Sequence, residues 1–249
     1  MPKISVCIPS HNGGYYIKEQ LQSILSQLSE NDEIIISDDF STDNTYAIVS
    51  SLKDTRIKFY HHQKSENPYQ GLYEKLWCIS QNIQHALYLA KGEYIFLSDQ
   101  DDIWLSGKVA AVTHKLASND IVVHNCKVVD NQMNIIIHSY FDQVVNPSVN
   151  IWRTINRSSF HGCCIAFSKN FLVQHIFPFP SLPIGHDTWI GITAIKNKAK
   201  IYFEKEPLIL YRRHENNVSA STGKSPNSLF FKLQYRLYLV RAYLLSPSK

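Results

Sequence analysis

The first hundred residues alternate apolar runs with segments of helical periodicity, and this alternation constrains the fold more than any other feature. Four runs have the composition of buried strands: residues 4–8, 33–37, 57–60 and 94–97. Three segments with apolar residues at helical spacing separate them: 15–28, the segment from DDFSTDNT to about residue 52, and about 73–90. Apolar strands alternating with helices predict an α/β fold whose mostly parallel central sheet carries helices on both faces.

Polar clusters directly follow three of these strands, at residues 9–12, 38–39 and 99–102. Ligands bind to open α/β sheets at the carboxyl ends of the strands. We therefore expect the three clusters to converge on one edge of the sheet and to form a site there.

The third cluster places Asp99, Asp101 and Asp102 within four residues, behind the buried run at 94–97. Carboxylates this close repel one another, and some stay protonated unless positive charge neutralises them. An acidic solvated turn is the simpler interpretation of such a cluster, but the buried strand before it favours a site for a cation or a cationic ligand.

Composition limits the class of protein. Among 249 residues, 44% are hydrophobic and 18% are charged, which is an ordinary globular balance. The net charge of +4 comes without a clustered basic stripe, so no nucleic-acid partner is expected. The five cysteines have no C-x-x-C spacing and are expected to be reduced thiols. The chain enters a strand at once and has no apolar run of about 20 residues, which predicts a cytoplasmic protein.

The second half is less regular. Helices are expected at 106–117 and 186–197, strands at 121–123, 164–167 and 207–211, and a loop-rich polar segment at 125–160. Since no linker is apparent, one domain is expected over residues 1–225.

The tail, residues 226–249, is predicted to be a basic amphipathic C-terminal helix. From Leu229 to Leu245 it mixes Phe, Leu, Tyr and Val with Lys232, Arg236 and Arg241. Such a helix either lies in an anionic membrane interface, as a peripheral contact, or packs on the core of the protein.

Five segments, in order, resemble motifs of the family-two glycosyltransferases, which are inverting enzymes with a GT-A fold and nucleotide-sugar donors. The chain is most similar to the bacterial polysaccharide, rhamnosyltransferase-like subgroup, over most of residues 3–219. The segments are ISVCIPSHNGGYYIKEQLQSILSQ, IIISDDFSTDNTYAIV, AKGEYIFLSDQDDIWLSGKV, GHDTW and LYRRHENNVS.

The resemblance implies that Asp99-Gln100-Asp101 is the D-x-D motif of a site for a divalent metal and a nucleotide diphosphate. Asp101 would ligate Mn²⁺ or Mg²⁺, which prefer carboxylate oxygens. Asp99 would approach the donor ribose or the metal, and Asp102 is a supporting candidate. Lys108 matches a family lysine and would pair with a carboxylate.

Arg212 and His214 match the basic motif near the end of the family's catalytic domain. They would contact the donor diphosphate, with His214 as a further metal ligand. Arg213 and Glu215 stand where Gln and Gly are usual in the family. A solvated basic loop is the alternative interpretation.

The donor base would lie against the first two strand ends. The resemblance gives Asp39 the hydrogen bond from the pyrimidine base, and Asp38 would brace the loop. Pro9, Ser10 and Asn12 would line the base and ribose pocket. Helix capping is an alternative explanation of the DDFSTD segment, and the two roles are compatible.

Asp187, in GHDTW, matches the carboxylate that takes the acceptor hydroxyl's proton in an inverting transfer. The alternative is an N-cap for a helix that begins near Thr188. Gly162 matches a family position where a small residue lets the chain approach the sugar.

The resulting prediction is transfer of a sugar from a UDP- or dTDP-sugar to a saccharide acceptor, expected to be polyprenyl-diphosphate-linked, in bacterial surface polysaccharide synthesis. Residues 1–105 would bind the donor and residues 106–225 the acceptor. One alternative is a sugar-phosphate nucleotidyltransferase, but PSHNGGYY lacks the basic residues usual in that class. The other is a non-catalytic nucleotide-sugar-binding module.

Overall fold

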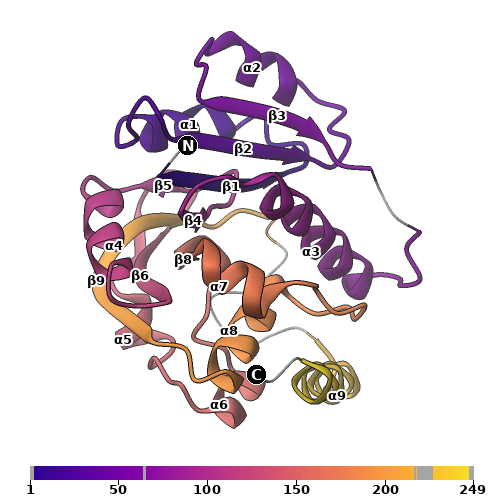
Figure 1. Cartoon of the computed structure of the whole chain (residues 1–249). Helices are drawn as coiled ribbons and strands as arrows, with labels where there is room; N and C mark the ends of the chain where they lie inside the picture. Colours follow the sequence, from indigo (N-terminus) through magenta and orange to yellow (C-terminus); the bar gives the residue numbers. More distant parts are fainter. Residues whose placement is uncertain (1–2, 64–65, 216, 218–226, 247–249) are drawn as a thin grey trace.

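The computed structural model describes residues 3–63, 66–215, 217 and 227–246. The strands, in chain order, are β1 (Ile4–Ser10), β2 (Glu33–Asp38), β3 (Ile57–His61), β4 (Tyr94–Leu97), β5 (Ile103–Trp104), β6 (Ile121–Val129), β7 (Ile135–Ile137), β8 (Ile165–Ser168) and β9 (Ile201–Arg212). In the described residues they form one nine-stranded sheet in the order β3-β2-β1-β4-β8-β6-β9-β5, with β7 paired to β6 (Figure 1).

Helices cover this sheet and link its strands. They are α1 (Ile17–Leu25), α2 (Thr45–Ser51), α3 (Leu72–Leu89), α4 (Lys108–Leu116), α5 (Tyr140–Gln143), α6 (Ile151–Asn156), the 3₁₀ turn η1 (Gly162–Cys164), α7 (Lys169–Phe171), the π-helical turn η2 (Leu172–Ile176), α8 (His186–Lys196) and α9 (Leu229–Leu245). None of the described helices is both long and apolar enough to cross a bilayer.

Strands β3, β2, β1 and β4 are all parallel, which confirms the prediction for the first half of the chain. Strands β1, β2 and β4 bury side chains on two faces because helices lie on both sides, whereas the edge strand β3 is only half-buried to exposed. Ile34 and Ile36 of β2 join the core that contains α1, whereas Ile35 and Cys7 join the core that contains α3. Double-sided burial explains why these strands read as nearly continuous apolar runs.

The second half adds antiparallel pairing, and two of its strands, β6 and β9, are longer than predicted. Strand β8 runs antiparallel to both β4 and β6, while β6 and β9 are parallel to each other. The apolar run of β6 is interrupted by His124 and Asn125, which are 1% and 2% exposed. Polar side chains inside a strand hide it from an apolar pattern. The segment 125–160, predicted to be loop-rich, therefore contains the end of β6 as well as β7, α5 and α6.

Helix α9 packs against α8 and α6 through Leu239 and Ala242, which are buried (Figure 1). Its opposite face exposes several large apolar side chains. The helix therefore does not separate apolar from basic residues as the sequence pattern indicates, because both of its faces are apolar. Residues 226 and 247–249 of the predicted tail, and residues 216 and 218–219 of the LYRRHENNVS motif, lie outside the described residues.

Candidate active site

The acidic turn after β4 lies at the carboxyl edge of the sheet, next to η1. Ligand atoms of Asp99, Asp102 and Cys163 lie within 4.8 Å of one another. The Oδ1 of Asp102 accepts a hydrogen bond from the backbone N–H of Arg212 at 3.1 Å. Its Oδ2 is buried and has no hydrogen-bond partner among the described residues. This turn thus holds carboxylate oxygens that the protein itself leaves incompletely satisfied.

Burial and mutual repulsion make the acidic turn reluctant to carry its full negative charge. Burial, with the charges of Asp101 and Asp187 adding to it, raises the pKa of Asp99 to about 7. Burial raises the pKa of Asp102 well above its ordinary value, and the charges of Asp101 and Asp99 act in the same direction. A bound cation would favour the ionised forms of these carboxyl groups.

Lys108 is a buried cation close to this turn. Among the described residues it forms no hydrogen bond with a carboxylate, in contrast to the prediction. Its ammonium donates to the carbonyl oxygen of Cys163 at 3.2 Å and lies 3.9 Å from the ring centroid of Trp104. Burial lowers its pKa to about 8, against the opposing charges of nearby groups that include Asp102 and Asp99.

His214 lies two residues after the end of β9 and contacts the acidic turn. Its Nε2 lies 2.7 Å from Oδ2 of Asp101, and its ring stacks on Tyr16 with centroids 4.8 Å apart. An imidazole nitrogen and a carboxylate oxygen are therefore already side by side. The structure brings together these two sequence-predicted residues, which are 113 positions apart.

Arg212 lies beside this pair. Its guanidinium donates to Oε2 of Glu19 at 2.6 Å and lies 4.9 Å from the ring centroid of Tyr16. The sequence motifs identified neither Glu19 nor Tyr16. Both lie at the start of α1, one helical turn apart, and a search for partners of the basic motif on the first helix could have found them.

Gln100, the middle residue of the acidic turn, joins it to the loop after β1. Its Oε1 accepts from the backbone N–H of His11 at 3.0 Å, and its Nε2 donates to the carbonyl of the same residue at 3.0 Å. A Cβ added to Gly13 would lie 2.7 Å from Cδ of this side chain. The close approach explains a glycine at that position.

Asp38 and Asp39 occupy the end of β2. Asp38 Oδ1 accepts from the hydroxyls of Ser10 at 3.1 Å and Ser41 at 2.6 Å, which is the bracing arrangement predicted for this residue. The backbone N–H of Asp39 donates to the carbonyl of Ser10 at 2.8 Å. The side-chain Oδ1 of Asp39 lies 3.5 Å from Nδ1 of His62.

Asn12 and Pro9 frame the same edge. Asn12 has a positive φ of 49°, and its Oδ1 accepts from the backbone N–H of Thr42 at 2.8 Å. Pro9 is half-buried and pairs in register with Ser37 of β2. The predicted base-side residues therefore lie together, with Asn12 tying the loops after β1 and β2 to each other.

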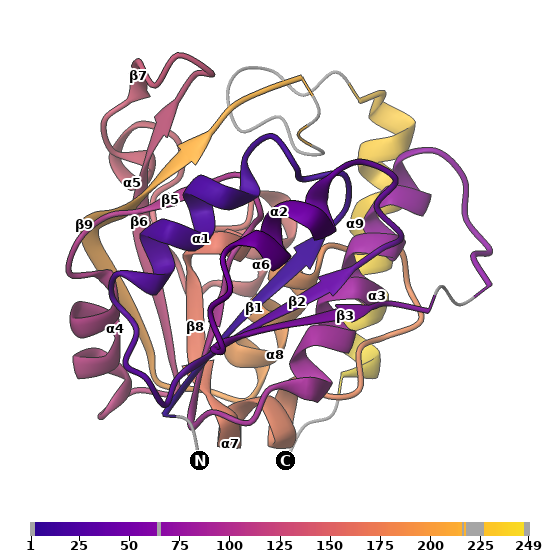
Figure 2. The same ribbon diagram turned by 90° about the horizontal axis from the view of Figure 1, so that it is seen from above.

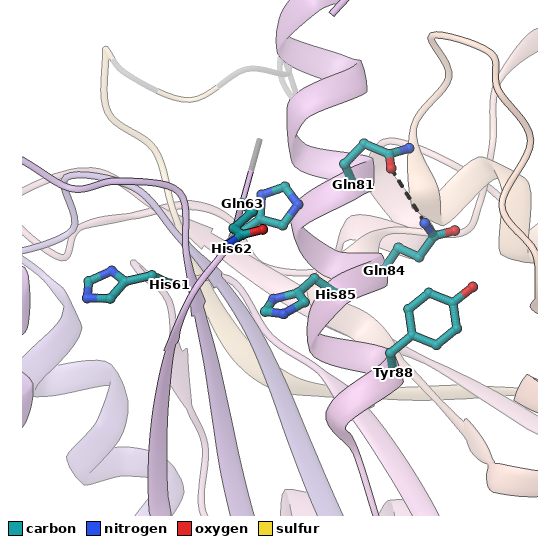
Figure 3. Close-up of a pocket in the computed structure, with 7 residues that line it drawn as sticks. All are labelled: His61, His62, Gln63, Gln81, Gln84, His85 and Tyr88. Carbon is teal, nitrogen blue, oxygen red and sulfur yellow. Dashed lines mark hydrogen bonds between the residues drawn. The ribbon is translucent and has the colours of Figure 1, made fainter. Parts of the chain in front are cut away.

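A cavity of about 430 Å³ opens beside this edge, between the end of β3 and α3 (Figure 3). Its lining is polar and aromatic: His61, His62, Gln63, Gln81, Gln84, His85 and Tyr88. His62 connects it to Asp39, and His85 bonds to the hydroxyl of Ser37 at 2.8 Å. None of these seven residues was identified from the sequence.

Asp187 lies in the first turn of α8, whose N-cap is Gly185. Its Oδ1 accepts from the backbone N–H of Thr188 at 2.6 Å and from the hydroxyl of the same residue at 3.2 Å. The predicted alternative, an N-cap at Asp187, is wrong because the helix begins at His186, two residues earlier than predicted. The charge of this carboxylate contributes to the raised pKa of Asp99, so the two groups share one electrostatic environment.

Two histidines flank Asp187. Burial lowers the pKa of both His161 and His186, and the charge of Asp187 partly opposes this in each case. A Cβ added to Gly162 would lie 2.7 Å from Nε2 of His186, so this glycine makes room for an imidazole. The sequence placed both histidines next to motif residues without assigning them a role.

Comparison with known proteins gives a consistent result. A family model described as glycosyl transferase family 2 matches residues 5–175. The dTDP-rhamnosyl transferase RfbG of Shigella flexneri is 28% identical over 93% of this chain and 78% of its own length. A GalNAc(5)-diNAcBac-PP-undecaprenol beta-1,3-glucosyltransferase of Campylobacter jejuni is 32% identical over 96% of this chain and 72% of its own length.

Among solved structures, Staphylococcus aureus TarS 1-349 in complex with UDP-GlcNAc has a TM-score of 0.69 at 21% identity, covering 99% of this chain and 68% of that one. The mannosyltransferase PcManGT from Pyrobaculum calidifontis, in complex with GDP-Man and Mn²⁺, has a TM-score of 0.60 at 18% identity, covering 98% and 72%. These likenesses show the GT-A fold.

Proposed function

The chain belongs to glycosyl transferase family 2, and from this premise we propose that it transfers a sugar, with inversion, from a UDP- or dTDP-sugar to a lipid-linked saccharide. One observation carries the proposal. The acidic turn and the Arg212–His214 segment meet at one edge of the sheet although they lie far apart in the chain, and the charge of Asp187 acts on the pKa of Asp99 in that turn.

The donor nucleotide is proposed to lie across the ends of β1 and β2. Asp39 would accept the hydrogen bond from the pyrimidine, while Pro9, Ser10 and Asn12 would line the base and ribose pocket. The braced loops there support this assignment, because the backbone contact of Ser10 with Asp39 fixes the two strand ends relative to each other. A UDP or dTDP donor agrees with the relatives, whose names include a dTDP-rhamnosyl transferase and UDP-Glc-dependent enzymes.

A divalent cation, Mn²⁺ or Mg²⁺, fits the acidic turn. The paired atoms of Asp101 and His214 supply oxygen and nitrogen ligands 2.7 Å apart, and Asp99 adds a further carboxylate. The buried, unpartnered Oδ2 of Asp102 shows that the turn has negative character left to satisfy. When bound, the cation would neutralise charge on the donor diphosphate. Arg212 would contact the same diphosphate from the side of Tyr16.

Asp187 is proposed as the general base. It would take the proton of the acceptor hydroxyl as that oxygen bonds to the anomeric carbon, while the bond from this carbon to the diphosphate oxygen breaks and its electron pair leaves with the diphosphate. The position of Asp187 in the first turn of α8 supports this role, because the helix N-terminus favours negative charge.

The acceptor is proposed to be a polyprenyl-diphosphate-linked saccharide in bacterial surface polysaccharide synthesis, at the inner face of the membrane. Two relatives support this, the glucosyltransferase of Campylobacter jejuni and the Escherichia coli enzyme WfgD, whose names both specify an undecaprenol-linked substrate. Residues 1–105 would bind the donor and residues 106–225 the acceptor.

The first test is donor binding, measured by thermal shift. UDP-glucose, UDP-galactose, UDP-N-acetylhexosamines and dTDP-rhamnose are screened with and without Mn²⁺, since a ligand that binds the folded state raises the midpoint of unfolding. A metal-dependent shift that is lost in Asp101→Ala supports the proposal. No shift with any donor or with free UDP would contradict it.

The second test separates catalysis from binding. Asp187→Asn is expected to keep the donor-induced shift and to lose transfer, because an amide cannot take the acceptor proton. Asp142→Asn, at an exposed carboxylate of α5, is the matched control and should keep both. Full transfer by Asp187→Asn would show that the base lies elsewhere.

A further inference from the structure

We propose that the outer face of α9 docks on an anionic membrane surface and holds the active site next to a lipid-linked acceptor. This inference deepens the proposed function and relies on it for the acceptor. The outer face is defined by the large apolar side chains that α9 exposes: Leu229, Phe230, Leu233, Leu237, Leu244 and Leu245.

These side chains form a stripe. Residues 230, 233, 237 and 244 follow helical spacing, so they lie along one side of the helix, and their side chains are 75%, 62%, 70% and 70% exposed. Large contiguous apolar patches on a protein surface mark sites of interaction with a partner or a membrane.

The stripe is not needed to hold the helix on the protein. Leu239 and Ala242 are buried on the opposite side, and Phe231 stacks on Tyr73 of α3 with centroids 4.6 Å apart. The helix therefore already has a complete packing face, and the outer face is additional apolar surface.

Charge identifies the occupant as an anionic lipid surface. The described part of the tail, residues 227–246, contains three basic residues, Lys232, Arg236 and Arg241, and no Asp or Glu. Arg241 is exposed and continues the stripe between Leu237 and Leu244. Lys232 and Arg236 are half-buried, and Arg236 donates to Oδ1 of Asn156 at 2.7 Å, so Arg241 is the cation that the outer face itself presents. Exposed apolar side chains beside a cation, on a segment without acidic residues, suit an interface of acyl chains and anionic headgroups. A second copy of the chain would instead bring like charges together.

The inner face of α9 connects this surface to the candidate base. The hydroxyl of Tyr235 accepts a hydrogen bond from the backbone N–H of Gly185 at 3.2 Å, two residues before Asp187. Figure 2 shows α9 alongside α3, with its first turn toward the edge where β1 and β2 end. A bilayer that holds α9 would thereby hold the segment carrying Asp187 at a fixed distance from the headgroups.

The test is flotation of the full chain with vesicles of 70:30 phosphatidylcholine and phosphatidylglycerol, compared with pure phosphatidylcholine. The double variant Leu233→Gln, Leu237→Gln is expected to lower the partition coefficient by about tenfold or more, given the transfer free energy of a leucine side chain. Arg241→Gln should lower it by about fivefold on the anionic vesicles alone. The matched control, Ile136→Gln with Val173→Gln, removes two apolar side chains of β7 and η2 that are 50% and 59% exposed, and should leave the partition coefficient within about twofold.

The outcomes are distinct. Loss of recovery in the α9 variants but not in the control, with unchanged thermal unfolding, supports docking. Docking is overturned by equal recovery of wild type and variants, by no recovery of wild type, or by a dimer in light scattering that only the α9 variants abolish. The vesicles contain neither donor nor acceptor, so failure here leaves the proposed transfer standing, whereas failure of the donor thermal shift leaves docking standing.

Discussion

Lys108 allows a quantitative test of the electrostatics of the acidic turn. Its side chain is 1% exposed, and its ammonium contacts only a carbonyl oxygen and an aromatic ring among the interactions described above. The variant Lys108→Met keeps much of the side-chain volume and removes the charge. It therefore isolates the contribution that the buried charge of Lys108 makes to the free energy of unfolding.

The magnitude follows from the pKa of Lys108, which burial lowers from 10.5 to about 8. Between these pH values the unfolded chain binds a proton that the folded protein does not. The free energy of unfolding of the wild type therefore rises as the pH increases from about 8 to 10.5. One pH unit corresponds to about 1.4 kcal/mol, so the gain is about 3 kcal/mol. Lys108→Met has no such group and should lack this gain.

The assay is urea denaturation of both proteins at several pH values from 7.5 to 10.5, without metal or donor. Other groups titrate in this range, but they are common to both proteins and cancel in the difference. The wild type should gain about 3 kcal/mol relative to Lys108→Met across the range. Lys115→Met, on the same helix, controls for removal of a lysine nearer the surface. A difference that stays constant with pH would refute the reasoning.

Three further predictions concern packing, acid stability and the basic motif. Gly191→Ala would place a Cβ 2.7 Å from Cγ of Phe160. The steric clash destabilises the protein and the higher helix propensity of alanine offsets part of this, so thermal unfolding should show a net loss of about 1 to 2 kcal/mol. Burial lowers the pKa of His124 well below 6.5, so wild-type stability falls below about pH 6.5 by up to about 1.4 kcal/mol per pH unit. Urea midpoints at pH 7 and 5 should show this loss, and a smaller one in His124→Gln. Arg212→Lys should weaken donor binding about tenfold, because a charged hydrogen bond is worth about 1.5 to 3 kcal/mol, and should change the midpoint of thermal unfolding little. The control variant Glu19→Gln should bind donor normally. Equal effects of the two substitutions on donor binding would argue against a contact between Arg212 and the diphosphate.

The parallel half of the fold could be predicted because its physics is local. Strands buried on both faces need apolar residues at every position, and this leaves a clear pattern in β1, β2 and β4. The extents of β6 and β9 could not be predicted in the same way. Asn125 is buried in β6 because its side chain bonds to the hydroxyl of Ser139 and the carbonyl of Lys205, partners that only the folded chain supplies.

The residues of the candidate site also differ in whether a sequence pattern or only the folded chain reveals them. Motif carboxylates such as Asp101 and Asp187 could be identified because their residue type and position follow a family pattern. Glu19 lies within the first motif segment but has no role in the family pattern given above, and it becomes relevant only when α1 packs beside the end of β9. The histidines of the cavity beside α3 were missed for the same reason, since His62 and His85 come together only when α3 packs against the sheet.

The double hydrogen bond of Gln100 to the backbone of His11 has a consequence for how the site responds to ligands. The side-chain amide pairs with a peptide unit as a neighbouring strand would, so the acidic turn and the loop after β1 are joined into a single rigid body. A cation that shifts the turn must also shift the loop that would contact the donor base, and the reverse holds as well. Metal and nucleotide affinities are therefore expected to be coupled thermodynamically through one neutral side chain. In Gln100→Ala each ligand should still bind, but metal should change the affinity for the nucleotide less than it does in the wild type.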